Sequence, residues 1–231
     1  MLIKDVCTLE EIKEMLIPNK EKIIAILQNL GMSETKVIHS VNVADAAIKI
    51  ANIMENNGKK VNKKIVQAGA LLHDIGLVRT FDDLSPAHGV IGADIVRKLG
   101  FPESVARCCE VHECDGGLTR IEAEEFKFPI LPLRESYAPN TIEEKIVTAA
   151  DLFLYILKEG PEEFGYDKYD PWENPEAIKD ALFPYIRDIY MKYLKKEVTI
   201  NNPILNRAYE INKEFLKYVT PDDLKNTRAN K

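Results

Sequence analysis

The sequence predicts an all-α fold, on the strength of three observations. Helix-capping signals recur along the chain: the Thr-Leu-Glu-Glu run at residues 8–11 and the Thr-Ile-Glu-Glu run at 141–144 both have the form of a capping box. Most of the expected helices end at a glycine or a proline. The alternation of apolar and polar residues that is typical of strands is nearly absent. With 231 residues, 45% of them hydrophobic, the chain is expected to form a single globular unit over residues 1–231.

The N-terminal helices are expected within residues 1–32. The first opens at Thr8 and ends at Pro18, and the second is closed by Gly31. Ser33 then caps a third helix in which apolar residues occupy most faces, so we expect this helix to be deeply buried.

The helix around which the chain is organised begins at Asn62 and ends in the His-Asp-Ile-Gly run at residues 73–76. Its small residues at 68–70 should let neighbouring helices come close to the turn that carries the His-Asp pair. A glycine inside a helix costs about 1 kcal/mol relative to alanine, and such close packing would offset that cost. We expect Gly76 to stop this helix.

Two helices are expected next, one over residues 85–100, opened by a Ser-Pro pair, and one from Pro102 to about His112. Residues 116–140 lack a helical period and contain three prolines. We therefore expect a long loop with at most one short helix, of the kind that often serves as a lid or binding loop.

The capping box at residues 141–144 opens a helix that is expected to continue to Lys158. Beyond it, the Asn-Pro pairs at residues 174–175 and 202–203 are expected to open two further helices. Proline interrupts the hydrogen bonds of a helix interior, so we expect Pro184 to break the first of these two.

The bulk composition excludes several classes of partner. The formal net charge is −6 with acidic and basic residues interleaved, so no extended nucleic acid is expected. No stretch approaches the roughly 18–20 apolar residues that cross a bilayer, and no signal peptide is recognisable, so a cytoplasmic protein without a membrane partner is expected. Four cysteines form no disulfide framework in a chain of this size. The three near His112 are expected to be buried free thiols, with a thiolate zinc site as the less favoured alternative.

Six residues form the candidate site: His39, His73, Asp74, His88, His112 and Asp151. They lie on or at the ends of five separate expected helices. A single helical histidine proves nothing, but all four histidines of the chain occupy apolar or helix-terminal positions. Asp151 stands in mid-helix among apolar neighbours and Asp74 ends a buried helix, and an unpaired carboxylate in such a place costs several kcal/mol. Together these residues predict one metal site.

The His-Asp-Ile-Gly run, with the order His, His-Asp, His, His, Asp, resembles the HD superfamily of metal-dependent phosphohydrolases in its HDIG branch. The resemblance covers residues 33–158 as an HD-type helical bundle with a metal-binding core. It leaves residues 1–32 as N-terminal helices and 159–231 as a C-terminal helical extension. Within the superfamily the chain looks most like archaeal HDIG-domain proteins of unassigned activity, and it is similar to dinuclear dinucleoside-tetraphosphate hydrolases.

The resemblance implies two divalent metal ions, with iron or manganese favoured and zinc, cobalt or nickel also suited to imidazole and carboxylate ligands. It places His39, His73 and Asp151 on one ion and His88 and His112 on the other. Asp74 would bridge the two ions and serve catalysis. Because His88 lies in the first turn of its helix, the helix dipole is expected to favour its neutral, ligating form.

The implied activity is hydrolysis of a phosphoester or phosphoanhydride in a small, nucleotide-like substrate, with a metal-bridging water as the nucleophile. Many HDIG proteins have a lysine directly after the glycine, whereas this chain has Leu77. Arg79 and Arg120 are therefore candidates for substrate binding, as is Arg134, with a solvated surface arginine as the alternative for each. No second histidine adjoins His112 and no Gly-Tyr-Pro follows it, so the cyclic-dinucleotide branch is not favoured.

Two other functions are compatible with the same residues. One is a di-iron oxygenase of HD type, since some proteins with this ligand pattern activate dioxygen. The other is a catalytically silent sensor that binds a nucleotide, which a loss of ligands would favour and which the intact set does not. A homodimer is left open. The tyrosines of the C-terminal helices, among them Tyr185, are expected to serve the core or an oligomer surface rather than a substrate site.

Overall fold

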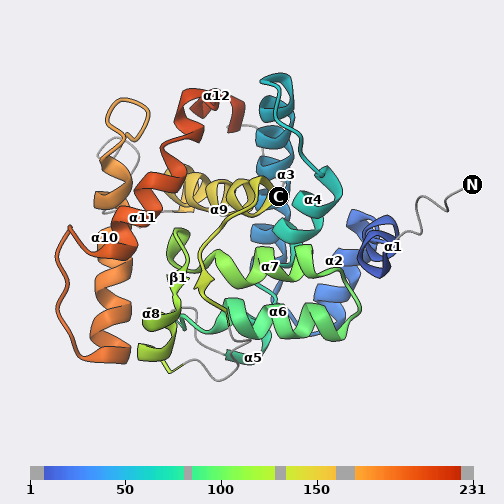
Figure 1. Ribbon diagram of the computed structural model, residues 1–231, viewed down its shortest axis with the longest axis horizontal. Coiled ribbons are helices and arrows are strands. Elements are labelled where there is room, and N and C mark those ends of the chain that lie inside the picture. The colour runs from blue at the N-terminus through green and yellow to red at the C-terminus, as the bar shows by residue number, and fades with distance from the viewer. Residues whose placement is uncertain (1–7, 81–84, 128–133, 160–169, 225–231) are drawn as a thin grey trace, which may run out of the picture.

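The computed structural model describes residues 8–80, 85–127, 134–159 and 170–224, and it confirms the all-α fold (Figure 1). Among these residues the strands are the two-residue β1 (Leu118–Thr119) and β2 (Ser136–Tyr137), which pair antiparallel. In the described part of the chain, no helix has the length and apolar character needed to cross a bilayer.

The predicted helices follow one another in the expected order, with α6 and α10 beginning two residues later than expected, and the short α5 and α12 were not predicted. Their bounds are α1 (Leu9–Met15), α2 (Lys20–Asn29), α3 (Glu34–Asn56), α4 (Lys63–Leu72), α5 (Leu77–Thr80), α6 (His88–Lys98), α7 (Glu103–Val111), α8 (Arg120–Glu125), α9 (Ile142–Leu154), α10 (Ala177–Ile189), α11 (Pro203–Asn212) and α12 (Pro221–Leu224). A π-helical turn, Tyr155–Glu159, extends α9. Ser33, Asn62, Thr141 and Asn202 cap their helices through the side chain, as predicted.

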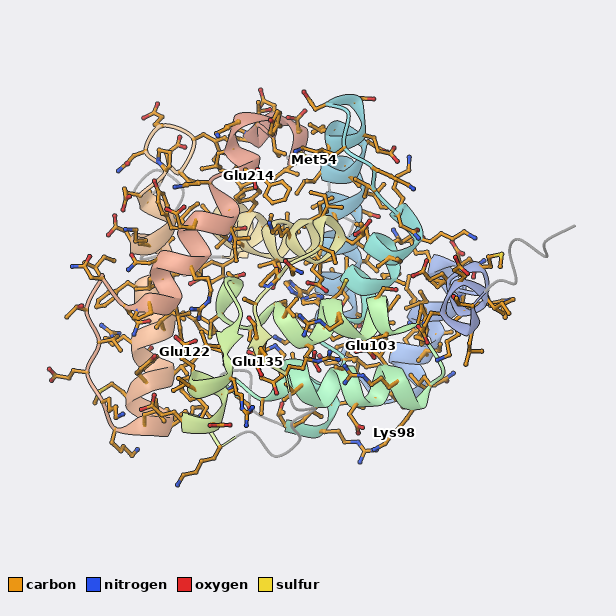
Figure 2. All side chains as sticks on the ribbon, viewed as in Figure 1. Met54, Lys98, Glu103, Glu122, Glu135 and Glu214 are labelled. Atoms are coloured by element: carbon orange, nitrogen blue, oxygen red, sulfur yellow. The ribbon has the colours of Figure 1, made fainter. Side chains whose placement is uncertain are left out.

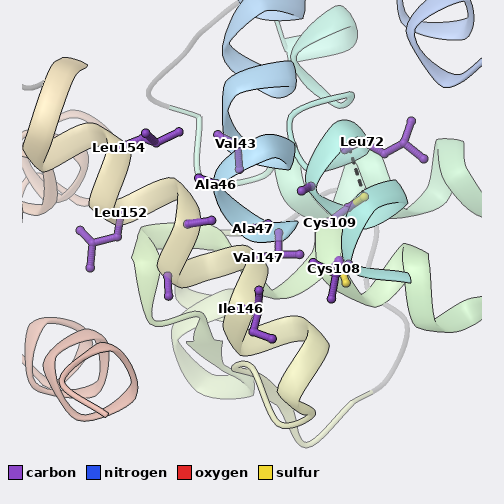
Figure 3. Packing of buried hydrophobic residues seen from close by; sticks show 14 of the residues in the cluster. Val43, Ala46, Ala47, Leu72, Cys108, Cys109, Ile146, Val147, Leu152 and Leu154 are labelled. Carbon is purple, nitrogen blue, oxygen red and sulfur yellow. Dashed lines mark hydrogen bonds between the residues drawn. The ribbon is translucent and has the colours of Figure 1, made fainter. Parts of the chain in front are cut away.

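The core lies where α3, α4, α7 and α9 meet, and α10 and α11 stand on the opposite side of it from α1 (Figure 1). Its contents are mostly small or branched side chains, including Ala46 and Ala47 of α3 and Val147 of α9 (Figure 3). A side chain at Gly69 would place its Cβ 2.6 Å from both Cβ and Sγ of Cys108. The missing side chain at Gly69 therefore allows Cys108 of α7 to pack directly against α4.

The cysteines belong to this core. Cys108, Cys109 and Cys114 are buried free thiols, as predicted, and Cys7 lies outside the described residues. The thiol of Cys109 donates to the backbone oxygen of Leu72 at 3.2 Å (Figure 3). Charged side chains such as Lys98 and Glu214 lie at the periphery (Figure 2).

The prediction that Gly76 stops a helix is wrong. Helix α4 already ends at Leu72, and Gly76 lies in the turn that leads to α5 without the positive φ of a helix-stopping glycine. A Cβ at Gly76 would stand 1.9 Å from the backbone oxygen of His88 and 2.7 Å from the backbone nitrogen of Gly92. Gly76 is needed because the main chain of α6 touches it.

The prediction that Pro184 breaks a helix is also wrong. Helix α10 runs through it from Ala177 to Ile189 and continues into a π-helical turn. An interior proline costs about 3 kcal/mol, and burial of the apolar face of α10, which includes Leu182 and Ile186, offsets that cost.

The segment at residues 116–140 has more structure than a loop with one short helix. Besides α8, it contains both strands of the small sheet, in which Leu118 lies opposite Tyr137. The side chain of Thr119 caps α8 in a capping box with Glu122. Residues 128–133, which include two of the three prolines, lie outside the described residues.

The contact at Gly76 gives a stability prediction. We expect Gly76→Ala to lower the free energy of unfolding by about 3 kcal/mol or more, because the added methyl group meets backbone that cannot rotate away. Gly31→Ala is the matched control: its Cβ would meet nothing within 4 Å, and only its positive φ should cost about 1 kcal/mol. Urea unfolding of both variants measures the difference. Equal losses would contradict the packing role of Gly76.

Candidate metal centre

The structure brings all six candidate residues together from five elements. His39 lies on α3, and His73 and Asp74 directly follow α4. His88 is the first residue of α6, His112 follows α7, and Asp151 lies on α9; these three complete the set. His73, Asp74, His88 and His112 are buried, whereas His39 and Asp151 are half-buried.

The two carboxylate oxygens of Asp74 face different histidines. Oδ1 lies 3.2 Å from Nε2 of His88 and 3.5 Å from Nε2 of His112. Oδ2 lies 3.7 Å from Nε2 of His39 and 3.6 Å from Nε2 of His73. Asp74 therefore stands between two pairs of imidazoles, with one oxygen directed to each pair.

Asp151 completes one of these two halves. Its Oδ1 lies 3.2 Å from Nε2 of His39 and 3.7 Å from Nε2 of His73. The two Nε2 atoms are 3.2 Å apart. The ligand-type atoms of His39, His73 and Asp151 all lie within 4.8 Å of one another and could hold a metal ion.

Backbone carbonyls fix the orientation of three imidazoles. Nδ1 of His73 lies 2.7 Å from the oxygen of Ala70, and Nδ1 of His112 lies 2.7 Å from the oxygen of Cys109. Nδ1 of His88 lies 2.8 Å from the oxygen of Ser85. A carbonyl only accepts, so each Nδ1 carries the proton, and in the neutral ring Nε2 presents a lone pair to the site.

The imidazoles and carboxylates of the site suit divalent metal ions. Nε2 of His88 and Nε2 of His112 are only 2.9 Å apart, although in their neutral forms both carry lone pairs. Either a proton on one Nε2 or a cation close to both removes the repulsion. Imidazole nitrogens with the opposite ring nitrogen bonded to a carbonyl, together with carboxylates, are the usual ligands of divalent iron, manganese and zinc. The residues present therefore fit divalent metal ions.

The second group of potential ligands differs in part from the one that the resemblance implies. His73, Asp74 and His112 have ligand-type atoms within 4.8 Å of one another, so His73 belongs to both groups. His88 is nevertheless within 3.2 Å of Asp74 and 2.9 Å of His112. The division of the six residues between two ions stays a prediction.

The acids of the site ionise readily. Burial favours the neutral acid, but the imidazoles of His73, His112 and His88 hold the pKa of Asp74 well below its usual range. Against the same effect of burial, His73 and His39 lower the pKa of Asp151 to about 2. Burial lowers the pKa of His73, which favours its neutral form.

The expectation that the helix dipole keeps His88 neutral is wrong for the metal-free protein. Burial by itself lowers the pKa of His88, but the carboxylates of Glu113 and Asp74 outweigh burial and raise the pKa to about 10. Two nearby full charges act more strongly on the ring than the partial charge at the start of α6. Without a metal ion the protonated form of His88 is therefore favoured, and a metal ion that binds its Nε2 would replace that proton.

Glu113 is a site residue that the sequence analysis missed. Its side chain is 1% exposed, its Oε1 accepts the backbone N–H of Gly89 at 2.6 Å, and the same oxygen lies 3.3 Å from Nδ1 of His88. It thus orients His88 from behind, as carboxylates commonly do for ligating histidines. Its position directly after His112 was the available signal.

Five of the six residues, all except the fully buried His73, line a cavity of about 480 Å³. Helix α3 contributes Thr35, Lys36, Ile38 and Asn42, and α10 contributes Leu182 and Tyr185. The remaining lining residues beyond the six are Leu77, Cys114, Asp115 and Tyr155. Tyr185 packs against the core, as expected, and in addition it lines the cavity.

The candidate arginines are placed elsewhere. Arg79 is exposed on α5, and the Nε of Arg120 donates to Glu124 at 2.8 Å on the surface of α8. Arg134 forms an ion pair with the buried Glu110 at 2.6 Å. None of the three lines the cavity as the described residues form it, whereas Lys36 does.

Residues 37–156 match the HD domain family. An uncharacterized protein of Methanocaldococcus jannaschii is 42% identical over 138 residues, which make up 60% of this chain and 76% of that protein. Proteins named tRNA (cytidine(56)-2'-O)-methyltransferase from Picrophilus torridus and Thermoplasma volcanium are 32% and 36% identical over 58% and 60% of this chain. The matched segments cover 36% and 37% of those two proteins, so the chain spans little more than a third of their length.

A solved structure also aligns with the chain. The HD domain of the L. monocytogenes phosphodiesterase PgpH, in complex with cyclic-di-AMP, superposes with a TM-score of 0.42 and 18% sequence identity over 84% of this chain and 95% of that one. A likeness this distant says nothing about the ligand of this chain.

The charge of His88 gives a prediction for the metal-free protein. The folded-state pKa of about 10 lies above the ordinary value of 6.5, so protonated His88 stabilises the fold fully below pH 6.5, and this contribution is lost as pH rises through 10. We expect His88→Gln to cost a few kcal/mol at pH 6 and much less at pH 10. Urea unfolding in a chelator at both pH values measures this. A cost independent of pH would show that His88 is neutral throughout.

Proposed function

The chain belongs to the HD domain family, and from this premise we propose that it is a metal-dependent phosphohydrolase acting on a small, nucleotide-like substrate. The bond cleaved is a phosphoester or a phosphoanhydride. The observation that carries the proposal is the position of Asp74, whose two oxygens each face a separate pair of imidazole nitrogens.

In this proposal one divalent ion would be held by His39, His73 and Asp151 and a second by His88 and His112, and Asp74 would be a ligand of both. When bound, such ions lower the pKa of a water and neutralise charge on the phosphoryl oxygens. Iron or manganese suits these ligands best, because they are imidazoles and carboxylates and include no thiolate.

The residues of the chain orient the metal ligands and shield the site from bulk water. The backbone carbonyls of residues 70, 85 and 109 hold the imidazoles so that each Nε2 points into the site. Burial of His73 and Asp74 keeps bulk water away from the base of the site. Rigid placement of this kind lowers the reorganisation that the reaction requires.

The cavity supports a small substrate with one charged and one apolar end. A volume of about 480 Å³ is in the range of pockets for small molecules. Lys36 lies among the lining residues and suits a phosphate group. Tyr155, Tyr185 and Leu182 offer aromatic and apolar surface for a base or sugar.

We propose a corresponding division of the chain. Residues 33–158 form the metal-binding unit, and the helices of residues 159–231 complete one wall of the cavity through Leu182 and Tyr185. Residues 1–32 add the N-terminal helices to the same globular unit.

Activity and metal content test the proposal together. We expect the protein, loaded with iron(II) or manganese(II), to hydrolyse at least one member of a panel of nucleoside phosphates and dinucleoside polyphosphates. Asp74→Ala should lower turnover by roughly a thousandfold or more and leave at most one ion per chain, because both halves of the site lose a shared ligand. Phosphate release and elemental analysis measure the two effects.

The matched control is Asp94→Asn, which removes an acid of α6 that pairs with Lys98 on the surface. It should keep full turnover and full metal content. If the wild-type protein turns over no member of the panel, the proposal is wrong, and dioxygen consumption by the iron(II) form would then favour the oxygenase alternative.

A further inference from the structure

The turn that follows His112 serves both imidazoles of the second proposed ion. His112 lies directly before the 3-10 turn Glu113–Asp115, and its backbone oxygen accepts the N–H of Asp115 at 2.9 Å. Glu113 belongs to the turn and lies behind His88, with 3.3 Å between its Oε1 and Nδ1 of His88. The Nε2 atoms of His88 and His112 are 2.9 Å apart. The position of this turn therefore affects both imidazoles at once.

The backbone of this turn is held in an unusual conformation. Cys114 and Asp115 are consecutive residues with φ of 55° and 53°, in the left-handed region that residues other than glycine seldom adopt. Such a conformation persists only where the surrounding structure enforces it. The turn therefore needs support from another part of the chain.

Helix α11 of the C-terminal extension provides that support, because its side chains bind three consecutive backbone oxygens. The amide of Asn212 donates to the oxygen of Asp115 at 2.9 Å. The guanidinium of Arg207 donates to the oxygen of Gly116 at 3.1 Å and to that of Gly117 at 2.8 Å. A Cβ at Gly116 would stand 2.6 Å from a backbone nitrogen of α11, so the two main chains are in contact.

Both of these side chains are themselves restrained. Asn212 is fully buried, and its amide also donates to the backbone oxygen of Ala208, one turn earlier in α11, at 2.8 Å. The guanidinium of Arg207 forms an ion pair with Glu122 at 2.7 Å, and Glu122 belongs to the capping box of α8. Groups restrained on two sides have little freedom to move, so they hold the turn in one position.

The ligands proposed for the other ion are positioned differently. His39 and Asp151 lie inside α3 and α9, and His73 directly follows α4. Among the described residues, the side-chain hydrogen bonds of α11 reach the turn and not these three ligands. Helix α11 also lies outside residues 37–156, which match the family. A change in α11 should therefore act on one half of the site and spare the other.

We infer that α11 positions the imidazoles of His88 and His112 for the second ion. The positioning residues are Arg207 and Asn212, which hold the turn, and the turn in turn fixes Glu113 behind His88. This inference rests on the proposed two-ion site. Loss of a group that orients a metal ligand without touching the ion commonly lowers metal affinity by roughly ten- to a hundredfold. The C-terminal extension is thus part of the metal centre as well as a wall of its cavity.

Manganese(II) binding to the metal-free protein tests this inference without any measurement of activity. We expect the wild-type protein to bind two ions per chain. Arg207→Gln should weaken one ion by roughly tenfold or more and leave the affinity for the other unchanged, and the weakened ion should be the one that His112→Gln removes. Arg207→Lys, which keeps a donor for one carbonyl, should restore part of the affinity. Electron paramagnetic resonance of free manganese(II) measures the binding.

Arg187→Gln is the matched control, because it removes an exposed arginine of α10 that pairs with Asp188. It should leave both affinities unchanged. Arg207 is half-buried, so its variant tests the inference even if the fully buried Asn212 is needed for folding. If Arg207→Gln weakens both ions equally, or neither, the inference is wrong although the two-ion site stands. A wild-type protein that binds fewer than two ions would refute the two-ion site itself, and the inference with it.

A second readout needs no metal ion. The Nδ1–H of His112 donates to a backbone oxygen at 2.7 Å, as does that of His73. In nitrogen-15 NMR of metal-free Arg207→Gln and Asn212→Ala, the Nδ1 proton of His112 should exchange with solvent several-fold faster than in the wild-type protein, while that of His73 keeps its rate. Equal acceleration at both histidines would show that α11 only stabilises the fold, and unchanged rates would show that it does not hold His112.

Discussion

The buried carboxylate of Asp74 is the constraint on which the site depends. A carboxylate taken out of water needs hydrogen-bond donors, cationic groups or a metal ion around it. Here four imidazoles from α3, α4, α6 and α7 surround it, and Asp151 of α9 shares two of them. Those helices must therefore meet at one point, and their small residues, such as Gly69, let them do so. Packing and charge impose the same geometry.

Local signals in the sequence predicted the order of the helices well. Side-chain caps such as Ser33, Asn62 and Asn202 act within three residues, so a single sequence contains all the information they need. The errors arose where distant contacts decide the outcome. Gly76 is required by α6 rather than by its own helix, and the buried face of α10 tolerates Pro184.

The six candidate site residues were identifiable because buried histidines and acids are rare in apolar helices. Glu113 was not identified, since its place beside His88 depends on a contact with Gly89 that no local pattern reveals. Arginine is common on surfaces, which is why Arg79 and Arg120 were weak candidates. The wall formed by α10 depends on how the extension folds back on the bundle, and helical spacing alone does not specify that.

The contact between Gly76 and the first turn of α6 limits how far the site can change its shape. There the main chains of two segments touch, and His73 and Asp74 precede one side of the contact while His88 forms the other. Backbone groups cannot rotate aside as side chains do. The segment that carries His73 and Asp74 therefore cannot move closer to the first turn of α6. Anything that binds between His88 and the His73–Asp74 pair has to fit a separation that the main chain, rather than the side chains, determines.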